Sequence, residues 1–229
     1  MLREYIIQDF NRAASHYDKY GDLQYEVAQE LIKRADIPKK ASILDCGAGT
    51  GNIARILKMP LTALDISFEM CKQNKNLSIC ADMELLPFKE NSFDVVFSSL
   101  ALQWVENKEK AINDMYSLVK KGGFLAVSTF GSNTLMELKN SYKAISPYMP
   151  VHDFNLPELS GYKLEKLSIQ REYQNLRTLL YKIKGVGGRF KSSGMQVGKC
   201  FFKELEEVYI KKYGKIIATW EVVFITRKK

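Results

Sequence analysis

A glycine-rich segment, ILDCGAGTG at residues 43–51, has the residue types and spacing best suited to chemistry. Gly47, Gly49 and Gly51 alternate between an apolar run and the helix-compatible stretch NIARILK. Because glycine has no Cβ, each position lets the backbone turn tightly or approach a ligand closely. The spacing is GxGxG rather than the GxGxxG of dinucleotide sites, and no lysine follows it as in a Walker loop. The segment therefore predicts either a small-molecule site that needs no triphosphate or an ordinary turn between a strand and a helix.

Three aspartates favour the small-molecule site, because each stands at the end of an apolar run. Asp45 precedes the first glycine by two residues, where it can accept hydrogen bonds from a ligand's ammonium group or from the turn's own amides. Asp65 ends LTALD, where a carboxylate can meet a ribose diol. Asp82 ends SICAD and can accept from an adenine amino group, while Met83 packs against the ring. A single aspartate at such a place commonly caps or turns the chain, but three beside one glycine turn predict a ligand with a nucleoside part.

These side chains need a sheet that brings the strand ends together. Five short apolar runs are separated mostly by helix-compatible stretches, which predicts parallel strands that alternate with helices. Right-handed crossovers would place helices on both faces and the ligand beyond the carboxyl ends of the strands. The expected strands cover residues 42–46, 61–66, 78–81, 93–98 and 124–129.

The flanking segments are expected to complete the fold. Apolar residues recur at helical spacing from residue 10 to residue 31, which predicts one or two amphipathic helices that end near Pro38. Residues 162–173 and 216–226 are rich in β-branched and aromatic residues and predict a closing pair of strands. Residues 182–194 hold four glycines and several basic residues, which predicts a flexible crossover rather than a core element.

The composition fits one globular domain. With 229 residues, 46% of them hydrophobic, the chain can bury a substantial core, and no repeat or low-complexity tract divides it. We expect a single domain over residues 1–229. Its expected parts are an N-terminal helical segment at 1–38, a ligand-binding core at 41–131, and a C-terminal part with a substrate cap and the closing strands at 132–229.

The remaining composition narrows the class of protein. Four cysteines without a CxxC pair, and only two histidines, offer no metal-ligand cluster, so we expect no metal and reduced thiols in the cytoplasm. The first nine residues contain both acids and a base, and no apolar stretch there is long enough for a signal or membrane helix. The net charge of +8 comes mostly from scattered lysines, which indicates a solvated surface or a surface for an acidic partner.

Taken together, five motifs resemble those of class I S-adenosylmethionine-dependent methyltransferases. The resemblance implies an α/β, Rossmann-like fold with a doubly wound, mostly parallel seven-stranded sheet, N-terminal helices and a small helical and loop cap. It also implies S-adenosyl-L-methionine as the cofactor. In chain order the motifs are ILDCGAGTG, ALDISFEM, ADMELLPF, FDVVFSSLALQWV and LVKKGGFLAVSTFG, over residues 43–131.

The implied cofactor site joins the aspartates and glycines above to residues beside them. Tyr17, in an N-terminal helix, is expected to close over the methionine end of the cofactor; the alternative is a tyrosine that packs in the core or an interface. Ser98 and Ser99 follow the fourth expected strand, where the reacting centre would lie. The full set is Tyr17, Asp45, Gly47, Gly49, Gly51, Asp65, Ile66, Asp82, Met83, Ser98 and Ser99.

Four further segments resemble the malonyl-acyl-carrier protein O-methyltransferase family of biotin synthesis. This resemblance implies transfer of a methyl group to the free carboxylate of a malonyl thioester on an acyl carrier protein or on coenzyme A. The ester would hide a charge whose burial in an apolar acyl channel costs several kcal/mol by order of magnitude, and so would prime pimeloyl and biotin synthesis. The segments are FNRAASHYDKYGDLQYEVAQEL (10–31), SLALQWV (99–105), TLMELKNSY (134–142) and LRTLLYKIKGVGG (176–188).

Such a reaction needs alignment more than proton transfer. A carboxylate with a pKa of roughly 3–4 is already ionised at neutral pH, so no general base is required, and none is assigned. With Tyr17, the residues expected to position the acceptor are Gln103 and Trp104, which would otherwise pack as a first helical turn on the sheet. An arginine suits a carboxylate, and the sequence does not choose among Arg12, Arg171, Arg177 and Arg189.

Other interpretations stay open from the sequence. A basic patch of Lys182, Lys184, Arg189 and Lys191 can meet an acidic carrier protein or simply keep the chain in solution. His16 and His152 are interpreted as structural. The acceptor can instead be a quinone precursor or a free carboxylic acid, or the chain can be a non-catalytic cofactor-binding assembly factor. A nucleic-acid methyltransferase is disfavoured, since no RNA-binding signature is present and SSLA follows the fourth expected strand, and the oligomeric state stays undetermined.

Overall fold

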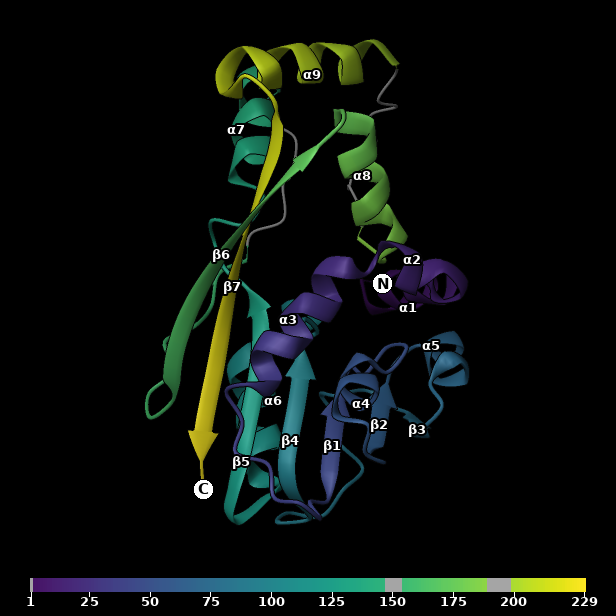
Figure 1. Ribbon diagram of the computed structural model, residues 1–229, viewed down its shortest axis with the longest axis vertical. Coiled ribbons are helices and arrows are strands. Elements are labelled where there is room, and N and C mark those ends of the chain that lie inside the picture. Colours follow the sequence, from purple (N-terminus) through teal and green to yellow (C-terminus); the bar gives the residue numbers. More distant parts are fainter. Residues whose placement is uncertain (1, 147–153, 189–198) are drawn as a thin grey trace.

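Seven strands form one sheet in the computed structural model of the protein, which describes residues 2–146, 154–188 and 199–229 (Figure 1). Their order across the sheet is β3-β2-β1-β4-β5-β7-β6. The first five run parallel, and the last two in the chain close the sheet as antiparallel neighbours. The expected sheet is confirmed, although β5 begins at Val119 instead of residue 124. The strands are β1 (Ile43–Cys46), β2 (Thr62–Asp65), β3 (Leu77–Cys80), β4 (Phe93–Ser99), β5 (Val119–Phe130), β6 (Lys163–Tyr173) and β7 (Ile216–Lys228).

Helices cover both faces of the parallel strands, so the sheet is doubly wound, as expected. These helices are α3 (Asp22–Ile32), α4 (Asn52–Leu57), α5 (Phe68–Gln73) and α6 (Lys108–Ser117). On one face α3 and α4 bury Leu31 and Ile53, and on the other α6 buries Ile112 and Met115. The order of the strands reverses between β1 and β4. Ligands of such sheets bind in the crevice at this point, outside the carboxyl ends of the strands.

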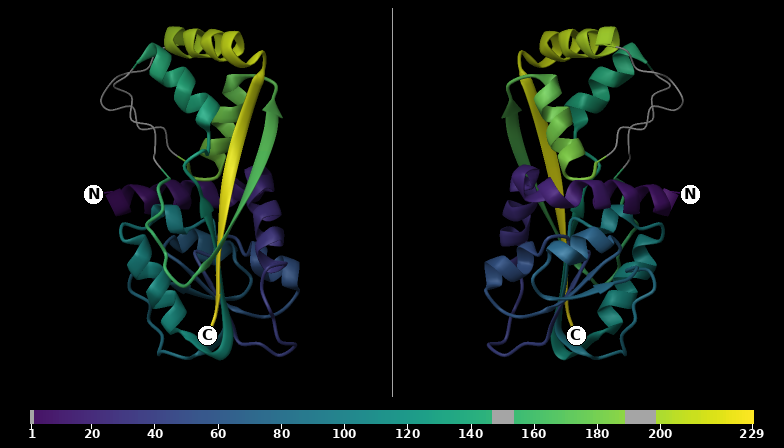
Figure 2. Two further views of the ribbon diagram at one scale, coloured as in Figure 1. Left: turned by 90° about the vertical axis from the view of Figure 1, so that its left-hand side faces the viewer. Right: turned by 90° about the vertical axis from the view of Figure 1, so that its right-hand side faces the viewer.

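The N-terminal segment lies across those carboxyl ends (Figure 2). It consists of α1 (Leu2–Ala13), the 3₁₀ turn η1 (Ala14–His16) and α2 (Tyr17–Tyr20), and α3 follows. The prediction of one or two helices ending near Pro38 is therefore wrong, because the helical part is broken more often and ends at Ile32. His16 leaves the helical conformation at φ −129° and ψ 6°, which turns the chain around the ends of the strands.

The C-terminal part builds a cap beyond the parallel strands. The far halves of β6 and β7 extend past the other strands, and three helices gather around them (Figures 1 and 2). The predicted crossover at residues 182–194 is wrong for Lys182–Gly185, which form the last turn of α8, because Leu179 and Gly185 of that helix are buried. Residues 189–194 lie outside the described residues. The cap helices are α7 (Met136–Ile145), α8 (Leu176–Gly185) and α9 (Lys199–Tyr213).

No helix within residues 2–146, 154–188 and 199–229 is both long and apolar enough to cross a membrane.

Candidate functional site

A cavity that is partly open to solvent lies at the carboxyl ends of the parallel strands. Its floor comes from the turns after β1, β2, β3 and β4, and α1 and α2 cover it. The topology places a ligand at this point, which is where the aspartates and glycines of the sequence converge. The lining residues discussed below are Arg3, Phe10, Tyr17, Gly47, Gly49, Asp65, Ile66, Asp82, Met83, Glu84, Ser99, Leu100, Trp104 and Glu106.

The glycine turn leaves room for a ligand at Gly49. This residue has φ +53°, and a Cβ built on it would meet no other atom within 4 Å, although Gly49 lines the cavity. A side chain there would project into the open space. Gly47 serves a different purpose, since a Cβ at its φ of +72° would lie 2.3 Å from the Cβ of Ala101. The first glycine therefore lets two loops pack, and the second keeps the cavity open.

Asp65 holds the glycine turn in place. Its Oδ2 accepts a hydrogen bond from the backbone N–H of Gly49 at 2.8 Å, and its Oδ1 accepts one from Ser67 at 2.8 Å. Burial raises the pKa of Asp65, while these backbone hydrogen bonds act in the opposite direction. The carboxylate thus reaches the cavity wall with its orientation already fixed. Oxygens placed in this way can accept from the hydroxyl groups of a sugar.

Asp45 lies behind the glycine turn rather than in the cavity wall. It is 2% exposed, and its Oδ1 has no hydrogen-bond partner among the described residues. Burial raises the pKa of Asp45 to about 8, and the nearby Asp65 contributes to the shift. A buried acceptor without a partner is costly, so a positively charged donor would be bound favourably nearby.

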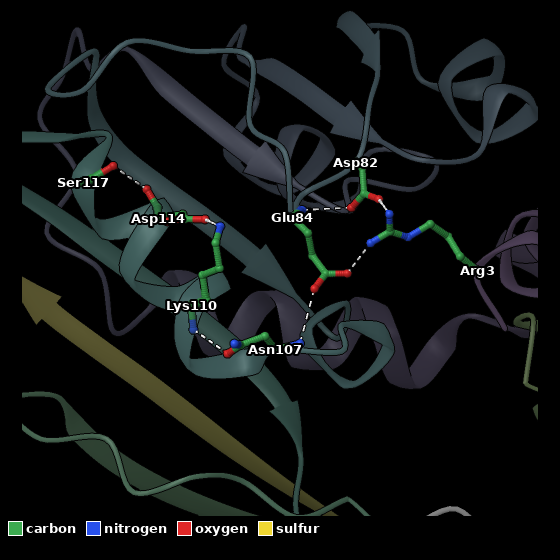
Figure 3. Close-up of polar contacts among 7 residues, drawn as sticks. All are labelled: Arg3, Asp82, Glu84, Asn107, Lys110, Asp114 and Ser117. Atoms are coloured by element: carbon green, nitrogen blue, oxygen red, sulfur yellow. Dashed lines mark hydrogen bonds and ion pairs between the residues drawn. The ribbon is translucent and has the colours of Figure 1, made fainter. Parts of the chain in front are cut away.

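Arg3, in the first turn of α1, contacts both Asp82 and Glu84 (Figure 3), and all three residues line the cavity. Arg3 pairs with the Asp82 carboxylate at 2.9 Å and with the Glu84 carboxylate at 2.5 Å. The other Asp82 oxygen accepts from the backbone N–H of Glu84 at 2.9 Å. Met83, between the two acids, is buried and lines the cavity, so an acid and an apolar side chain are side by side where an aromatic ring could stack.

Aromatic side chains line another part of the cavity. Phe10 of α1 meets Trp104 of η2 (Leu102–Trp104) edge to face, with ring centroids 5.4 Å apart. Tyr17 of α2 also lines the cavity, and burial, with Asp65 and Asp18 nearby, raises the pKa of its phenol. Tyr17 therefore stays neutral and can donate a hydrogen bond from an otherwise apolar wall.

The structure brings most of the predicted cofactor residues together around the cavity. Four predicted residues lie behind the lining instead. Ser98 is fully buried and its Oγ has no hydrogen-bond partner among the residues that the structure describes, while Gly51 caps the start of α4 at φ +93°. The amide of Gln103 donates to the Leu100 carbonyl at 2.6 Å and accepts from Thr129 at 3.2 Å, so its polar atoms are engaged within the protein. Those that line the cavity are Tyr17, Gly47, Gly49, Asp65, Ile66, Asp82, Met83, Ser99 and Trp104; those behind it are Asp45, Gly51, Ser98 and Gln103.

Arginines were considered from the sequence as partners for the carboxylate of the acceptor. None of those that the structure describes lines the cavity. Arg12 projects into solvent and pairs with Asp9 on its own helix. Arg171 pairs with Asp22 and Glu26, and Arg177 donates to Tyr181. Arg189 lies outside the described residues, as do Lys191 and His152. His16 is exposed and contacts the ring of Tyr20 edge to face.

The charged rim of the cavity was not predicted from the sequence. Arg3, Glu84 and Glu106 line it, yet Arg3 lies 79 positions before Asp82 in the sequence. Only the fold shows this pairing. The acid two residues after Asp82, in the motif ADMELLPF, was the available signal for Glu84.

The charge of the cavity suits a cation. Four carboxylates line it, from Asp65, Asp82, Glu84 and Glu106, and Arg3 is the one cationic side chain among the described lining residues. Such a wall attracts a ligand with ammonium or sulfonium charge and disfavours a polyphosphate. The described residues hold no group of three side chains that could bind a metal ion.

Comparisons with known proteins agree with this geometry. Residues 44–127 match the family described as a methyltransferase domain. A malonyl-acyl-carrier protein O-methyltransferase of Gallionella capsiferriformans is 31% identical over 97% of this chain and 91% of its own length. The biotin biosynthesis bifunctional protein BioHC of Teredinibacter turnerae is 29% identical over 98% of this chain and 46% of its own length.

A solved structure supports the fold. The phosphoethanolamine N-methyltransferase 2 of Haemonchus contortus, in complex with phosphomonomethylethanolamine and S-adenosylhomocysteine, superposes with a TM-score of 0.59 at 17% identity. The match covers all of this chain and 60% of that one. At this level of identity the likeness concerns the arrangement of the sheet and helices.

Proposed function

The chain belongs to the malonyl-acyl-carrier protein O-methyltransferase family, and on this premise we propose that it methylates the free carboxylate of a malonyl group held as a thioester on an acyl carrier protein. The similarity to a relative of that name along nearly the whole of both chains is the observation that carries the proposal. The name of the Teredinibacter turnerae relative supports a role in biotin synthesis. The methyl donor is S-adenosyl-L-methionine.

The residues around the cavity fit this cofactor. Gly49 leaves open space where a backbone must approach a ligand, and the four carboxylates suit a molecule with a sulfonium and an ammonium group. In our proposal Asp65 accepts from the ribose hydroxyls, while Asp82 accepts from the adenine amino group beside Met83. Ile66 and Ser99 complete the wall, and Asp45, Gly51 and Ser98 support it from behind.

When bound, the cofactor supplies an electrophilic methyl group whose carbon–sulfur bond breaks as the new carbon–oxygen bond forms. The malonyl carboxylate is ionised at neutral pH, so no proton has to move and no general base is needed. The work of the protein is to align the acceptor and to exclude water, and orientation of this kind lowers a barrier by several kcal/mol, roughly. Tyr17 and Trp104 are the residues that we propose for this positioning, with Gln103 fixing the turn that carries Trp104.

The carrier protein needs a docking surface close to this aromatic wall. The turn after α8 packs against Phe10, since a Cβ on Gly187 would lie 2.8 Å from its ring. The basic residues Lys182 and Lys184 of α8 are thus close to the N-terminal helices that cover the cavity, and Lys182 pairs with Asp22 at 3.2 Å. We propose that an acidic carrier protein docks on this basic surface. We also propose that the reaction takes place in the cytoplasm, where proteins ordinarily lack paired cysteines.

The test is transfer of a labelled methyl group from S-adenosyl-L-methionine to malonyl-acyl carrier protein. Acetyl-acyl carrier protein is the matched control, because it lacks only the free carboxylate. We expect label on the malonyl form alone. Mild base should release this label, because it is held as a methyl ester. Equal transfer to malonyl-coenzyme A would assign the acyl group rather than the carrier as the recognised part, and no transfer to any malonyl thioester would refute the proposal.

A further inference from the structure

Three polar ties hold the N-terminal segment, residues 2–20, over the cavity. Each tie reaches the loop after a different one of the first three strands, or the helix that follows that loop. Such ties are individually weak, because they are partly exposed to water. The ties are Arg3 to Asp82 and Glu84 after β3, Asn11 to Ser67 and Glu69 after β2, and Asp18 to Thr50 and Arg55 after β1.

This segment also supplies part of the cavity wall. Ile6, Phe10 and Tyr17 line the cavity from above, opposite the glycine turn and Asp65. A ligand in the cavity therefore lies between the segment and the ends of the strands, and the ties fix the position of this part of the wall.

The tie at Arg3 involves a residue that the cofactor also needs. One oxygen of Asp82 accepts from the backbone N–H of Glu84, and the other pairs with the Arg3 guanidinium (Figure 3). Glu84 holds the guanidinium from its other side at 2.5 Å, and the backbone N–H of Asn107 donates to Glu84 at 3.3 Å. Each oxygen of the Asp82 carboxylate therefore already contacts one donor of the protein while the segment is closed. A donor from adenine must displace the guanidinium or share its acceptor.

We propose that Arg3 is a latch that fastens the N-terminal segment over the cavity and competes with the cofactor for Asp82. Binding of the cofactor at Asp82 then weakens the tie at the first turn of α1, and closure of the tie weakens binding at Asp82. The two processes are linked, so each disfavours the other by the same factor. The inference rests on the proposed cofactor site but not on the identity of the methyl acceptor.

The test compares two variants of the same helix. Arg3→Gln removes the latch, and Arg12→Gln makes the same change of charge at a side chain that is 72% exposed and pairs only weakly with Asp9, at 3.8 Å. Calorimetry with S-adenosylhomocysteine gives the affinity, and fluorescence of Trp104, which lines the cavity, gives the association rate. We expect Arg3→Gln to bind about two- to fivefold more tightly than wild type, the size expected for one exposed ion pair, and to associate faster. Arg12→Gln should match wild type.

Other outcomes separate the latch from the proposed function. Unchanged or weaker binding by Arg3→Gln, beside normal binding by wild type, would overturn the latch and leave the proposed function standing. Failure of the wild-type protein to bind S-adenosylhomocysteine would overturn the proposed cofactor site itself. If Arg3→Gln does not fold, Arg3→Met provides the second test, because it removes the guanidinium while keeping a long side chain and both carboxylates, Asp82 and Glu84. That variant should also bind more tightly than wild type, and equal or weaker binding would overturn the latch.

Discussion

Gly49 is the residue whose replacement separates ligand binding from folding most cleanly. We expect Gly49→Val to lower cofactor affinity at least about tenfold, because a side chain at this position projects into the cavity where the ligand must lie. The matched control is Gly122→Val in the first part of β5. Gly122 also has a positive φ, +81°, and a Cβ there likewise meets nothing within 4 Å.

Both variants introduce similar backbone strain, on the order of 1–3 kcal/mol, but only Gly49 lines the cavity. Calorimetry with S-adenosylhomocysteine measures the affinity of each. Wild-type affinity in Gly49→Val, or an equal loss in Gly122→Val, would contradict the assignment of the glycine turn to the cofactor.

Asp45 makes stability depend on pH. Burial raises its pKa to about 8, whereas an aspartate in the unfolded chain titrates near 4, roughly. Between these values the native state binds the extra proton, so the free energy of unfolding falls as the pH rises and is highest below the unfolded pKa. We expect wild type to lose about 2 kcal/mol more than Asp45→Asn between pH 5 and pH 7. Urea unfolding of both proteins at the two pH values measures this, and parallel changes would show that Asp45 is not the responsible group.

At the scale of elements, the contact between α8 and the N-terminal segment depends on the absence of a side chain. A Cβ on Gly187, at φ +80°, would lie 2.8 Å from the ring of Phe10. We expect Gly187→Ala to lower the free energy of unfolding by about 1–3 kcal/mol more than Gly214→Ala, because of this overlap. Gly214 has a similar φ of +76° and open space around its Cβ position. Urea unfolding compares the two, and equal losses would mean that backbone strain alone accounts for the effect.

The strands and the glycine turn could be predicted because their signals are local. An apolar run that leads through Asp45 into a glycine turn indicates a strand and a site in one short window. The breaks between α1, η1 and α2 could not be predicted, since the chain bends at His16 to follow the ends of strands that lie far along the sequence. The pairing of Arg3 with Asp82 could not be predicted for the same reason, because the two residues are far apart in the sequence. Helical spacing also does not predict that the Gln103 amide points into the protein and contacts Leu100 and Thr129.

At the scale of the whole molecule, the net charge is +8, and the effect of each basic residue on binding of an acidic carrier protein depends on where that residue lies. We expect Lys184→Glu to raise KM for malonyl-acyl carrier protein about threefold or more with little change in kcat, because this exposed residue lies on α8 beside the N-terminal segment. The matched control is Lys121→Glu, which makes the same change of net charge at an exposed position in the first part of β5. Steady-state kinetics measures both, and equal effects would indicate general attraction rather than docking at α8.

One hydrophobic core joins the parallel strands to the cap. Buried residues run without interruption from Leu31 of α3 through Phe97 of β4 to Tyr209 of α9. This continuity favours the predicted single domain, because the buried apolar residues described in the three cap helices belong to this shared core. A shared core is consistent with the ligand-binding core and the C-terminal cap acting as one unit.

The position of β7 has a consequence for how the chain is made. β7 lies between β5 and β6 in the sheet but follows both in the sequence, so β6 has no neighbour until β7 has been synthesised. Pairing of this kind is non-local and slow. Until β7 has been made, the edges of β5 and β6 that it later covers stay open to pairing with other chains, so this stage of synthesis is the one most exposed to aggregation.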